Sequence, residues 1–187
     1  MNESIIEAVR VMKSGGVILY PTDTVWGLGC DATNEAAVRK IFEIKHRAEA
    51  KSLVLLASDL DMVARYIKKI PDIAIDLVTV NDAPMTVIYP GAVGLAPSTV
   101  AEDGSVGIRI PLNHECAELC RRLGRPVVST SANISGEPTP KTFKEIAQDL
   151  IDAVDYVVDP ELEKGSSGAA SQIIKVGLDS EISIIRA

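Results

Sequence analysis

Short apolar runs alternate along this chain with longer segments of helical periodicity, and this alternation limits its fold more than any other feature. Residues 17–20 are an unbroken apolar run closed by Pro21, which predicts a buried strand. The segment before them repeats apolar side chains at helical spacing, has Ser4 and Glu7 in capping-box positions, and ends at two consecutive glycines. The chain therefore begins with a helix and a strand, and the same succession recurs to its end.

This recurrence predicts an α/β fold in which helices cover a central sheet. The strand pairs within 86–110 and 171–186 lack a helical crossover, so the sheet should be mixed rather than all parallel. The further predicted helices span residues 34–47, 59–69, 73–80, 115–123 and 142–151, the last opening on a capping box of Thr142 and Glu145. The further predicted strands span residues 53–57, 86–89, 106–110, 126–130, 153–158, 171–176 and 182–186.

Size and charge exclude several classes of protein. With 187 residues, of which 47% are hydrophobic, the chain can bury one substantial core, and we expect a single domain over residues 1–187. A net charge of −7 argues against a surface that binds nucleic acid everywhere. The longest uncharged stretch, 83–101, is interrupted by prolines and glycines and predicts no membrane span. The N-terminal segment is not a secretory signal, so we expect the protein in the cytoplasm.

Polar residues that could bind a small ligand follow the strand predicted at 17–20. Thr22 and Thr24 offer hydroxyl groups, Asp23 offers a carboxylate, and the nearby glycines let the backbone approach a ligand closely. A structural loop with an Asx or Thr turn explains the same segment equally well.

A group of cations stands at the end of the helix predicted at 34–47. Lys45, Arg47 and Lys51 could converge on an anion of several charges, with Arg47 offering a planar fork to phosphate oxygens. Basic residues in the last turn of a helix also complement the helix dipole, and that explanation needs no ligand.

The segment richest in hydrogen-bonding side chains is 129–136, Ser-Thr-Ser-Ala-Asn-Ile-Ser-Gly, which follows another apolar run. So many consecutive donors indicate a site for a carboxylate, a ribose or a phosphate rather than a plain turn. Arg109 stands in an otherwise apolar strand, where it either reaches solvent at an edge or pairs with a buried anion. The glycine-rich run 165–171 is either a lid or a surface loop.

Several common catalytic patterns are absent from the sequence. It has no P-loop, no dinucleotide-binding fingerprint and no nucleophile elbow. Neither the two histidines nor the three cysteines show the spacing of metal ligands, and we expect no metal held by protein side chains. Catalysis should then depend on positioning and on stabilising phosphate charge rather than on a covalent intermediate.

The ordered set of these motifs resembles the YrdC-like family. That family shows Pro-Thr-Asp/Glu-Thr at the end of a strand, then Lys-x-Arg, Lys-x-Leu, Pro-x-Thr, Val-Gly-x-Arg-x-Pro and Ser-x-Asn-x-Ser-Gly, and this chain matches the order from residue 17 to about 140. The resemblance implies a twisted open mixed sheet flanked by helices, with a large concave cleft. It also implies threonylcarbamoyl-AMP synthase activity, which makes threonylcarbamoyl-AMP and pyrophosphate from L-threonine, bicarbonate and ATP.

The resemblance further implies roles for individual residues. The catalytic cations would be Lys45, Arg47 and Lys51. The threonine-binding residues would be Thr24, Arg109, Ser129 and Ser171. The ATP-binding residues would be Arg47, Lys51, Ser105, Ser131, Asn133, Thr139 and Arg186. A magnesium ion would be expected on the phosphates, and a downstream threonylcarbamoyl transferase would use the product to modify position 37 of tRNA.

Two alternatives stay open. The concave basic surface of the family is associated with double-stranded RNA, and the basic groups near Lys45 and Arg121 could follow RNA phosphates, although the negative net charge and an aromatic content of 4% disfavour this. A YciO-like paralogue would share the first two motifs and could act on a different small acid. The complete Ser-x-Asn-x-Ser-Gly motif at 131–136 favours the synthase.

Overall fold

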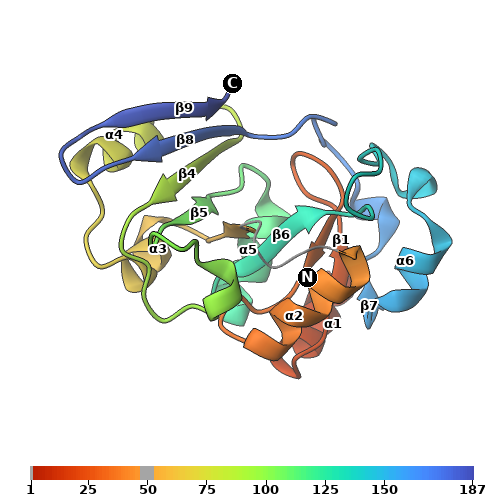
Figure 1. Ribbon diagram of the computed structural model, residues 1–187. Helices are drawn as coiled ribbons and strands as arrows, with labels where there is room; N and C mark the ends of the chain where they lie inside the picture. Colours follow the sequence, from red (N-terminus) through yellow and green to blue (C-terminus); the bar gives the residue numbers. More distant parts are fainter. Residues whose placement is uncertain (1, 47–52) are drawn as a thin grey trace.

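The computed structural model describes residues 2–46 and 53–187, and its strands form one twisted sheet (Figure 1). The strands are β1 Ile18–Tyr20, β2 Gly27–Gly29, β3 Val54–Leu56, β4 Met85–Tyr89, β5 Val106–Arg109, β6 Val127–Ser131, β7 Tyr156–Val157, β8 Gln172–Val176 and β9 Ile182–Arg186. Their order is β7-β1-β2-β6-β3-β5-β4-β8-β9. β7, β5 and β8 run parallel to β1, β3 and β4 respectively, and the other neighbours are antiparallel. The mixed α/β sheet predicted from the sequence is confirmed.

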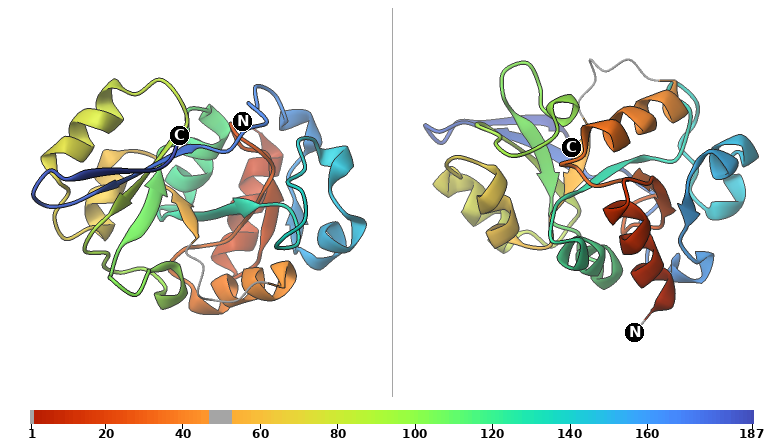
Figure 2. Two further views of the ribbon diagram at one scale, coloured as in Figure 1. Left: turned by 45° about the horizontal axis from the view of Figure 1, so that its top comes forward. Right: turned by 90° about the horizontal axis from the view of Figure 1, so that it is seen from below.

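Helices flank this sheet. They are α1 Glu3–Lys13, α2 Glu35–Lys45, α3 Leu60–Tyr66, α4 Asp72–Val80, α5 His114–Leu123 and α6 Gln148–Ala153, with single 3₁₀ turns η1 Pro97–Thr99, η2 Phe143–Glu145 and η3 Pro160–Leu162. α1 packs against α5, and α5 packs against β3 (Figure 2). None of the helices within the described ranges is both long enough and apolar enough to cross a bilayer.

The two faces of the sheet differ in chemistry because side chains alternate along each strand. On one face the register aligns apolar, buried residues: Val128, Leu55, Ile108, Val87 and Ile174. On the other face most of the residues are small or polar: the register aligns Ser129, Val54, Gly107, Ile88 and Lys175, and it pairs Gly27 with Ser131 and Arg109 with Thr86. The first face belongs to the core, and the second is free to carry a site.

The start of α1 differs from the prediction. The N-cap is Asn2, whose side chain accepts a hydrogen bond from the Ser4 N–H at 2.9 Å, so Ser4 does not cap the helix. The Ser4 hydroxyl instead shares a hydrogen bond of 2.9 Å with the Tyr156 hydroxyl and accepts one from the Asp159 N–H at 2.9 Å. A contact with a distant segment has thus replaced the local one.

The helix predicted at 142–151 is also wrong in its first half. Thr142 makes no capping hydrogen bond, and Glu145 accepts one from the Lys141 N–H at 2.7 Å. Only the 3₁₀ turn η2 forms there, the chain is extended at Ile146, and α6 begins at Gln148. Ile146 is buried, so packing of its side chain accompanies this break.

Strand β2 was not predicted, because the sequence around it is glycine-rich. Gly27 and Gly29 have low intrinsic strand preference, yet β2 pairs with β1 on one side and β6 on the other. A Cβ atom at Gly29 would lie 2.6 Å from the Tyr20 ring and 2.7 Å from the Val128 carbonyl oxygen. The glycine therefore lets β2 approach its neighbours closely. The other predicted elements are confirmed within three residues at each end.

Candidate active site

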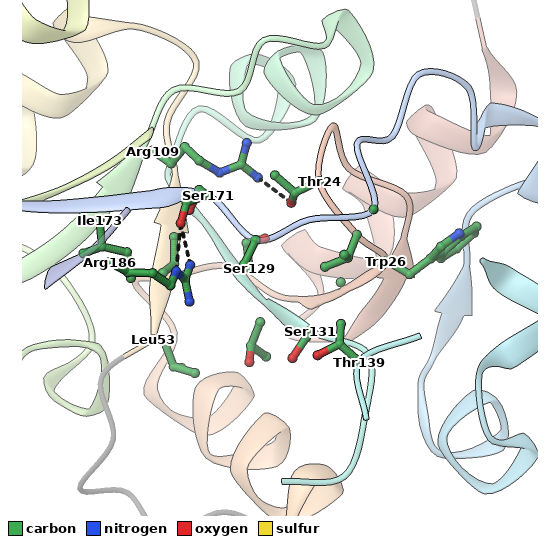
Figure 3. Close-up of a pocket in the computed structure, with 16 residues that line it drawn as sticks. Thr24, Trp26, Leu53, Arg109, Ser129, Ser131, Thr139, Ser171, Ile173 and Arg186 are labelled. Carbon is green, nitrogen blue, oxygen red and sulfur yellow. Dashed lines mark hydrogen bonds between the residues drawn. The ribbon is translucent and has the colours of Figure 1, made fainter. Parts of the chain in front are cut away.

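A pocket of about 370 Å³ opens on the small and polar face of the sheet. It collects seven of the residues singled out in the sequence: Thr24, Arg109, Ser129, Ser131, Thr139, Ser171 and Arg186. Figure 3 shows Arg109 and Arg186 on either side of Ser171. The larger concave cleft implied by the family resemblance stays a prediction.

A compact turn after β1 presents Thr24 to the pocket. Thr22 Oγ1 accepts hydrogen bonds from the N–H of Thr24 at 3.0 Å and of Val25 at 3.1 Å. The Thr22 and Thr24 hydroxyls share a further hydrogen bond of 2.9 Å. The turn that one reading of the sequence expected is therefore present, and it also brings Thr24 and Val25 to the pocket wall.

Arg109 pairs with a buried anion, which was one of the two alternatives for it. Its side chain is 3% exposed and forms an ion pair with Asp23, whose side chain is 6% exposed. The second oxygen of Asp23 accepts a hydrogen bond from the Leu112 N–H at 3.0 Å. Arg109 Nη2 donates to Thr24 Oγ1 at 3.5 Å. One part of the guanidinium group is held by Asp23, and another faces Thr24 at the pocket.

Arg186 reaches the pocket through an irregularity in β9. The pairing of β8 with β9 shifts at Ile185, which has no partner of its own, and Arg186 consequently pairs with Ile173. Its Nε and Nη2 atoms donate to the Ser171 carbonyl oxygen at 2.9 and 2.7 Å. The Ser171 hydroxyl shares a hydrogen bond of 2.7 Å with the Thr86 hydroxyl. Ser171 therefore links Arg186 to β4.

The glycine-rich run 165–171 contributes one wall of the pocket. The Ser167 N–H donates to the Asp23 carbonyl oxygen at 2.9 Å. The Gly168 N–H donates to the Thr24 carbonyl oxygen at 2.8 Å. These bonds attach the run to the turn that carries Thr24, so it is part of the site rather than a detached surface loop.

Lys45 lies beside the pocket and is almost completely buried. Its Nζ donates to the carbonyl oxygens of Ser131 and of Asn133, the latter at 2.7 Å, and its own carbonyl accepts from the Ser135 N–H at 2.9 Å. The Asn133 amide nitrogen donates to the Glu137 carbonyl oxygen at 2.8 Å. Among the described residues, Asn133 Oδ1 is buried with no hydrogen-bond partner. The end of α2 thus holds the 129–136 loop in place.

A second pocket, of about 480 Å³, shares Leu53, Val54 and Ile173 with the first. It contains the predicted ATP-binding residue Ser105, whose hydroxyl donates to Asp103 Oδ1 at 2.5 Å. Hydrogen bonds from Lys175 and Ser105 hold the pKa of the Asp103 carboxyl well below its usual range, so it is ionised at neutral pH. The two pockets are neighbours on one face of the sheet.

Two predicted catalytic cations, Arg47 and Lys51, lie outside the described residues, so their roles stay predictions. The cysteines nearest the site are not nucleophiles. Burial raises the pKa of Cys120 to about 12, and burial together with the Asp23 charge raises the pKa of Cys116. Within residues 2–46 and 53–187, no group of three His, Cys, Asp or Glu side chains could hold a metal ion.

Three residues at the site could not be assigned a role from the sequence. Asp23 was only one carboxylate in a polar segment, and Thr86 appeared only as the last residue of the Pro-x-Thr motif. Trp26 lines the first pocket, is fully buried and lies 5.0 Å from the Phe143 ring. Its Nε1 is a buried donor with no partner in the described part of the chain. Their partners are distant in sequence, so no local pattern could reveal these roles.

Comparison with known proteins agrees with this architecture. Among curated proteins, the threonylcarbamoyl-AMP synthase of Stenotrophomonas maltophilia is 37% identical over 157 residues, covering 82% of this chain and 84% of that protein. The structure of P. abyssi Sua5 complexed with L-threonine superposes with a TM-score of 0.83 at 26% identity, covering 94% of this chain and 52% of that one. E. coli YciO superposes with a TM-score of 0.80 at 26% identity, covering 97% and 87%.

This chain thus spans about half the length of that Sua5 chain and most of the length of YciO. Residues 10–187 match the family Sua5/YciO/YrdC, whose description reads "Telomere recombination". That range includes every residue of the first pocket and every strand of the sheet order given above. The chain therefore belongs to the Sua5/YciO/YrdC family.

Proposed function

We propose that this protein is an L-threonylcarbamoyladenylate synthase, which converts L-threonine, bicarbonate and ATP into threonylcarbamoyl-AMP and pyrophosphate. The observation that carries the proposal is one pocket in which Arg109 and Arg186 flank Ser171, beside the serines of β6. Two guanidinium groups in one pocket suit a reaction between two anions. Relatives named threonylcarbamoyl-AMP synthase, at 33% to 37% identity, support the same activity.

Threonine would lie beside Arg109. Its carboxylate would accept hydrogen bonds from the part of the guanidinium group that Asp23 does not hold. The hydroxyls of Thr24, Ser129 and Ser171 would bind its amino and hydroxyl groups, because a hydroxyl both donates and accepts. The P. abyssi Sua5 structure complexed with L-threonine supports an amino-acid site in this fold.

The proposed chemistry has two bond-forming steps. First the threonine nitrogen attacks the carbon of bicarbonate and water leaves, which produces a carbamate. A carbamate oxygen then attacks the α-phosphorus of ATP, the bond from that phosphorus to the bridging oxygen of the β-phosphate breaks, and pyrophosphate leaves. Both partners in the second step are anions, so fixed cations and donors would lower its barrier. The wall formed by 165–171 would limit the access of water to the mixed anhydride.

ATP would extend from the first pocket into the second, since the two share part of their lining. Ser131, Thr139 and Arg186 would bind it in the first pocket, and Ser105 in the second. Asn133 Oδ1, which needs a donor, would accept one from a nucleotide hydroxyl. From the sequence motifs alone, Arg47 and Lys51 are proposed to neutralise phosphate charge during the reaction, with Lys45 beside them.

Magnesium would accompany the nucleotide rather than occupy a protein site. The described residues include no group of three or more His, Cys, Asp or Glu side chains that could hold a metal ion, and magnesium in nucleotide sites is bound mainly through phosphates and water. Bound there, it would neutralise charge on the departing pyrophosphate. None of the steps assigned to the residues above depends on it.

The proposed setting is the cytoplasm, where a separate threonylcarbamoyl transferase would pass the group to tRNA. Nothing in the part of the chain that the structure describes favours direct RNA binding. In the basic group around residue 121, Arg121 and Arg122 pair with Glu118, and Arg125 pairs with Asp31. These arginines are already partly neutralised, which weakens them as phosphate ligands.

The test is an AMP adduct whose formation depends on threonine. Purified protein is incubated with α-labelled ATP, bicarbonate and single amino acids, and the adduct and pyrophosphate are quantified. We expect both products with L-threonine only, and neither without bicarbonate. Pyrophosphate release that does not depend on threonine, or a clear preference for another amino acid, would refute the proposed substrate.

A pair of matched substitutions locates the activity in the pocket. Arg109→Lys keeps the charge but loses the planar fork, so the rate should fall by roughly a hundredfold or more. Arg125→Lys changes an arginine that also pairs with an aspartate but lies outside both pockets, and it should leave the rate unchanged. Equal rates in the two variants would place the chemistry elsewhere.

A further inference from the structure

The two arginines of the first pocket are held by acceptors of different charge. Arg109 is held by the carboxylate of Asp23, and both side chains are almost fully buried. Arg186 is held by the neutral carbonyl group of Ser171, and no carboxylate within residues 2–46 and 53–187 forms an ion pair with it. The Arg186 side of the pocket therefore keeps a full positive charge, whereas the Arg109 side is close to neutral before a ligand binds.

Asp23 cannot easily turn away from Arg109. One carboxylate oxygen accepts from the guanidinium group, and the other accepts from the Leu112 N–H at 3.0 Å. The Asp23 carbonyl oxygen accepts from the Ser167 N–H at 2.9 Å. Side chain and backbone are both anchored, so the negative charge stays at a fixed place beside the pocket.

Carboxylate and phosphate groups respond differently to a fixed negative charge. Both accept paired hydrogen bonds from a guanidinium group. A phosphate group can carry about twice the charge of a carboxylate near neutral pH, and the Coulomb energy scales with the product of the charges. Asp23 therefore repels a phosphate about twice as strongly as a carboxylate at the same distance, and salt screens a buried charge only weakly.

We propose that Asp23 is a positioning and specificity-determining residue that reserves Arg109 for a singly charged carboxylate and keeps phosphate groups on the Arg186 side. The inference rests on the proposed function, because it takes the threonine carboxylate as the ligand of Arg109. Without the Asp23 charge, neither arginine that flanks Ser171 would have an anionic partner, and phosphate groups would compete for the amino-acid position. The role of Asp23 is thus to separate the two substrates within one pocket.

The experiment measures equilibrium binding of radiolabelled L-threonine to the full chain while inorganic pyrophosphate is added at constant ionic strength. In the wild-type protein, pyrophosphate should leave the affinity for threonine unchanged. Asp23→Asn keeps the side-chain shape and an acceptor for Arg109 but removes the charge. In that variant pyrophosphate should displace threonine, at concentrations at least about tenfold below the highest that leaves the wild type unaffected. Asp23→Glu restores the charge and should restore resistance to pyrophosphate.

A matched control tests whether the effect depends on where the negative charge is removed or only on the change in net charge. Asp31 is also buried and pairs with an arginine, Arg125, at 2.7 Å, but it lies outside both pockets. Asp31→Asn makes the same change in net charge and should behave as the wild type. A merely structural role for Asp23 would weaken threonine binding without making it sensitive to pyrophosphate.

The remaining outcomes are also decisive. If pyrophosphate fails to displace threonine from Asp23→Asn, or displaces it equally from the wild type and the variant, the role of Asp23 is overturned. The proposed function would stay intact. No threonine binding by the wild type would overturn both, and this is seen before any variant is tested. Circular dichroism shows whether each variant is folded. If Asp23→Asn is unfolded, the inference can still be refuted: displacement of threonine by pyrophosphate from the wild type or from Asp23→Glu would contradict it.

Discussion

Gly27 and Gly29 are both on β2, yet their surroundings differ. A Cβ atom at Gly29 would lie 2.6 Å from the Tyr20 ring and 2.7 Å from a carbonyl oxygen of β6, so something would have to move. A Cβ atom at Gly27 would meet its nearest neighbours at 3.4 Å, which is ordinary contact. Only one of the two glycines is therefore required by the space available to it.

We expect Gly29→Ala to lower the free energy of unfolding by about 1–3 kcal/mol, because an added methyl group forces apart tightly packed strands. Gly27→Ala should leave it unchanged or raise it by up to about 1 kcal/mol, since alanine restricts the unfolded chain. Urea denaturation of the two variants beside the wild type measures both values. Equal destabilisation would mean that β2 needs flexibility rather than space.

At the scale of elements, the end of α2 supports the 129–136 loop through Lys45. The ammonium group binds two carbonyl oxygens of that loop, at Ser131 and Asn133, in a nearly buried position. Hydrogen bonds to a charged group contribute about 1.5–3 kcal/mol each. This arrangement offers an explanation of Lys45 that differs from the catalytic role predicted for it: the lysine can act by holding the loop.

Substitution of Lys45 by methionine distinguishes the two explanations. If the lysine holds the loop, Lys45→Met should reduce hydrogen-exchange protection of residues 131–136 and lower turnover by roughly tenfold or more. The matched control is Lys40→Met on the same helix, where the exposed pair with Asp155 contributes about 0–1 kcal/mol, so little should change. Lost turnover with normal protection of the loop would instead favour direct action of Lys45 on the nucleotide.

At the scale of the whole molecule, one sheet and one buried core run through the described chain. We propose on this basis that residues 1–187 form a single domain. Such a domain should unfold in one transition, with coincident curves from circular dichroism and from Trp26 fluorescence. Its stability should also depend on pH, because acidic and thiol side chains have shifted pKa values.

The acidic limb of that dependence follows from lowered pKa values. The Met62 N–H bound to Asp59, and Lys175 bound to Asp103, hold these carboxyl pKa values below the unfolded value of about 3.9. The folded state then binds fewer protons, so this stability is complete above about pH 4 and is lost as pH falls. Urea midpoints measured from pH 6 to pH 2.5 should decline, and a flat profile would contradict the assignment.

The alkaline limb has the opposite sign. Burial raises the folded pKa of Cys120 to about 12, above the unfolded value of about 8.5. The stability from the neutral thiol is therefore complete below about pH 8 and is lost as pH rises. Cys120→Ala should flatten the decline of the urea midpoint above pH 8 relative to the wild type, whatever its effect at neutral pH. An unchanged slope would exclude this thiol as the cause.

Much of the architecture was predictable because local patterns report burial. The strands predicted at 17–20 and 86–89 both formed, and the helix predicted at 115–123 became α5. Prediction failed where a distant partner decided the outcome. Ser4 bonds to Tyr156 instead of capping α1, and β2 forms because two other strands accept it despite its glycines.

The family resemblance was needed to name Thr139 and Arg186, whereas local patterns alone identified the polar segments that follow strands, such as residues 22–24 and 129–136. Local order of side chains along the chain is enough for that, since strand ends in an α/β sheet meet at common places. The contacts that hold the pocket residues appear only in the folded chain: Asp23 pairs with Arg109, the Ser171 carbonyl accepts from Arg186, and Lys45 binds the 129–136 loop. The physical reason is that these partners come from segments far apart in sequence, and only packing of the whole sheet fixes the charge that each arginine meets.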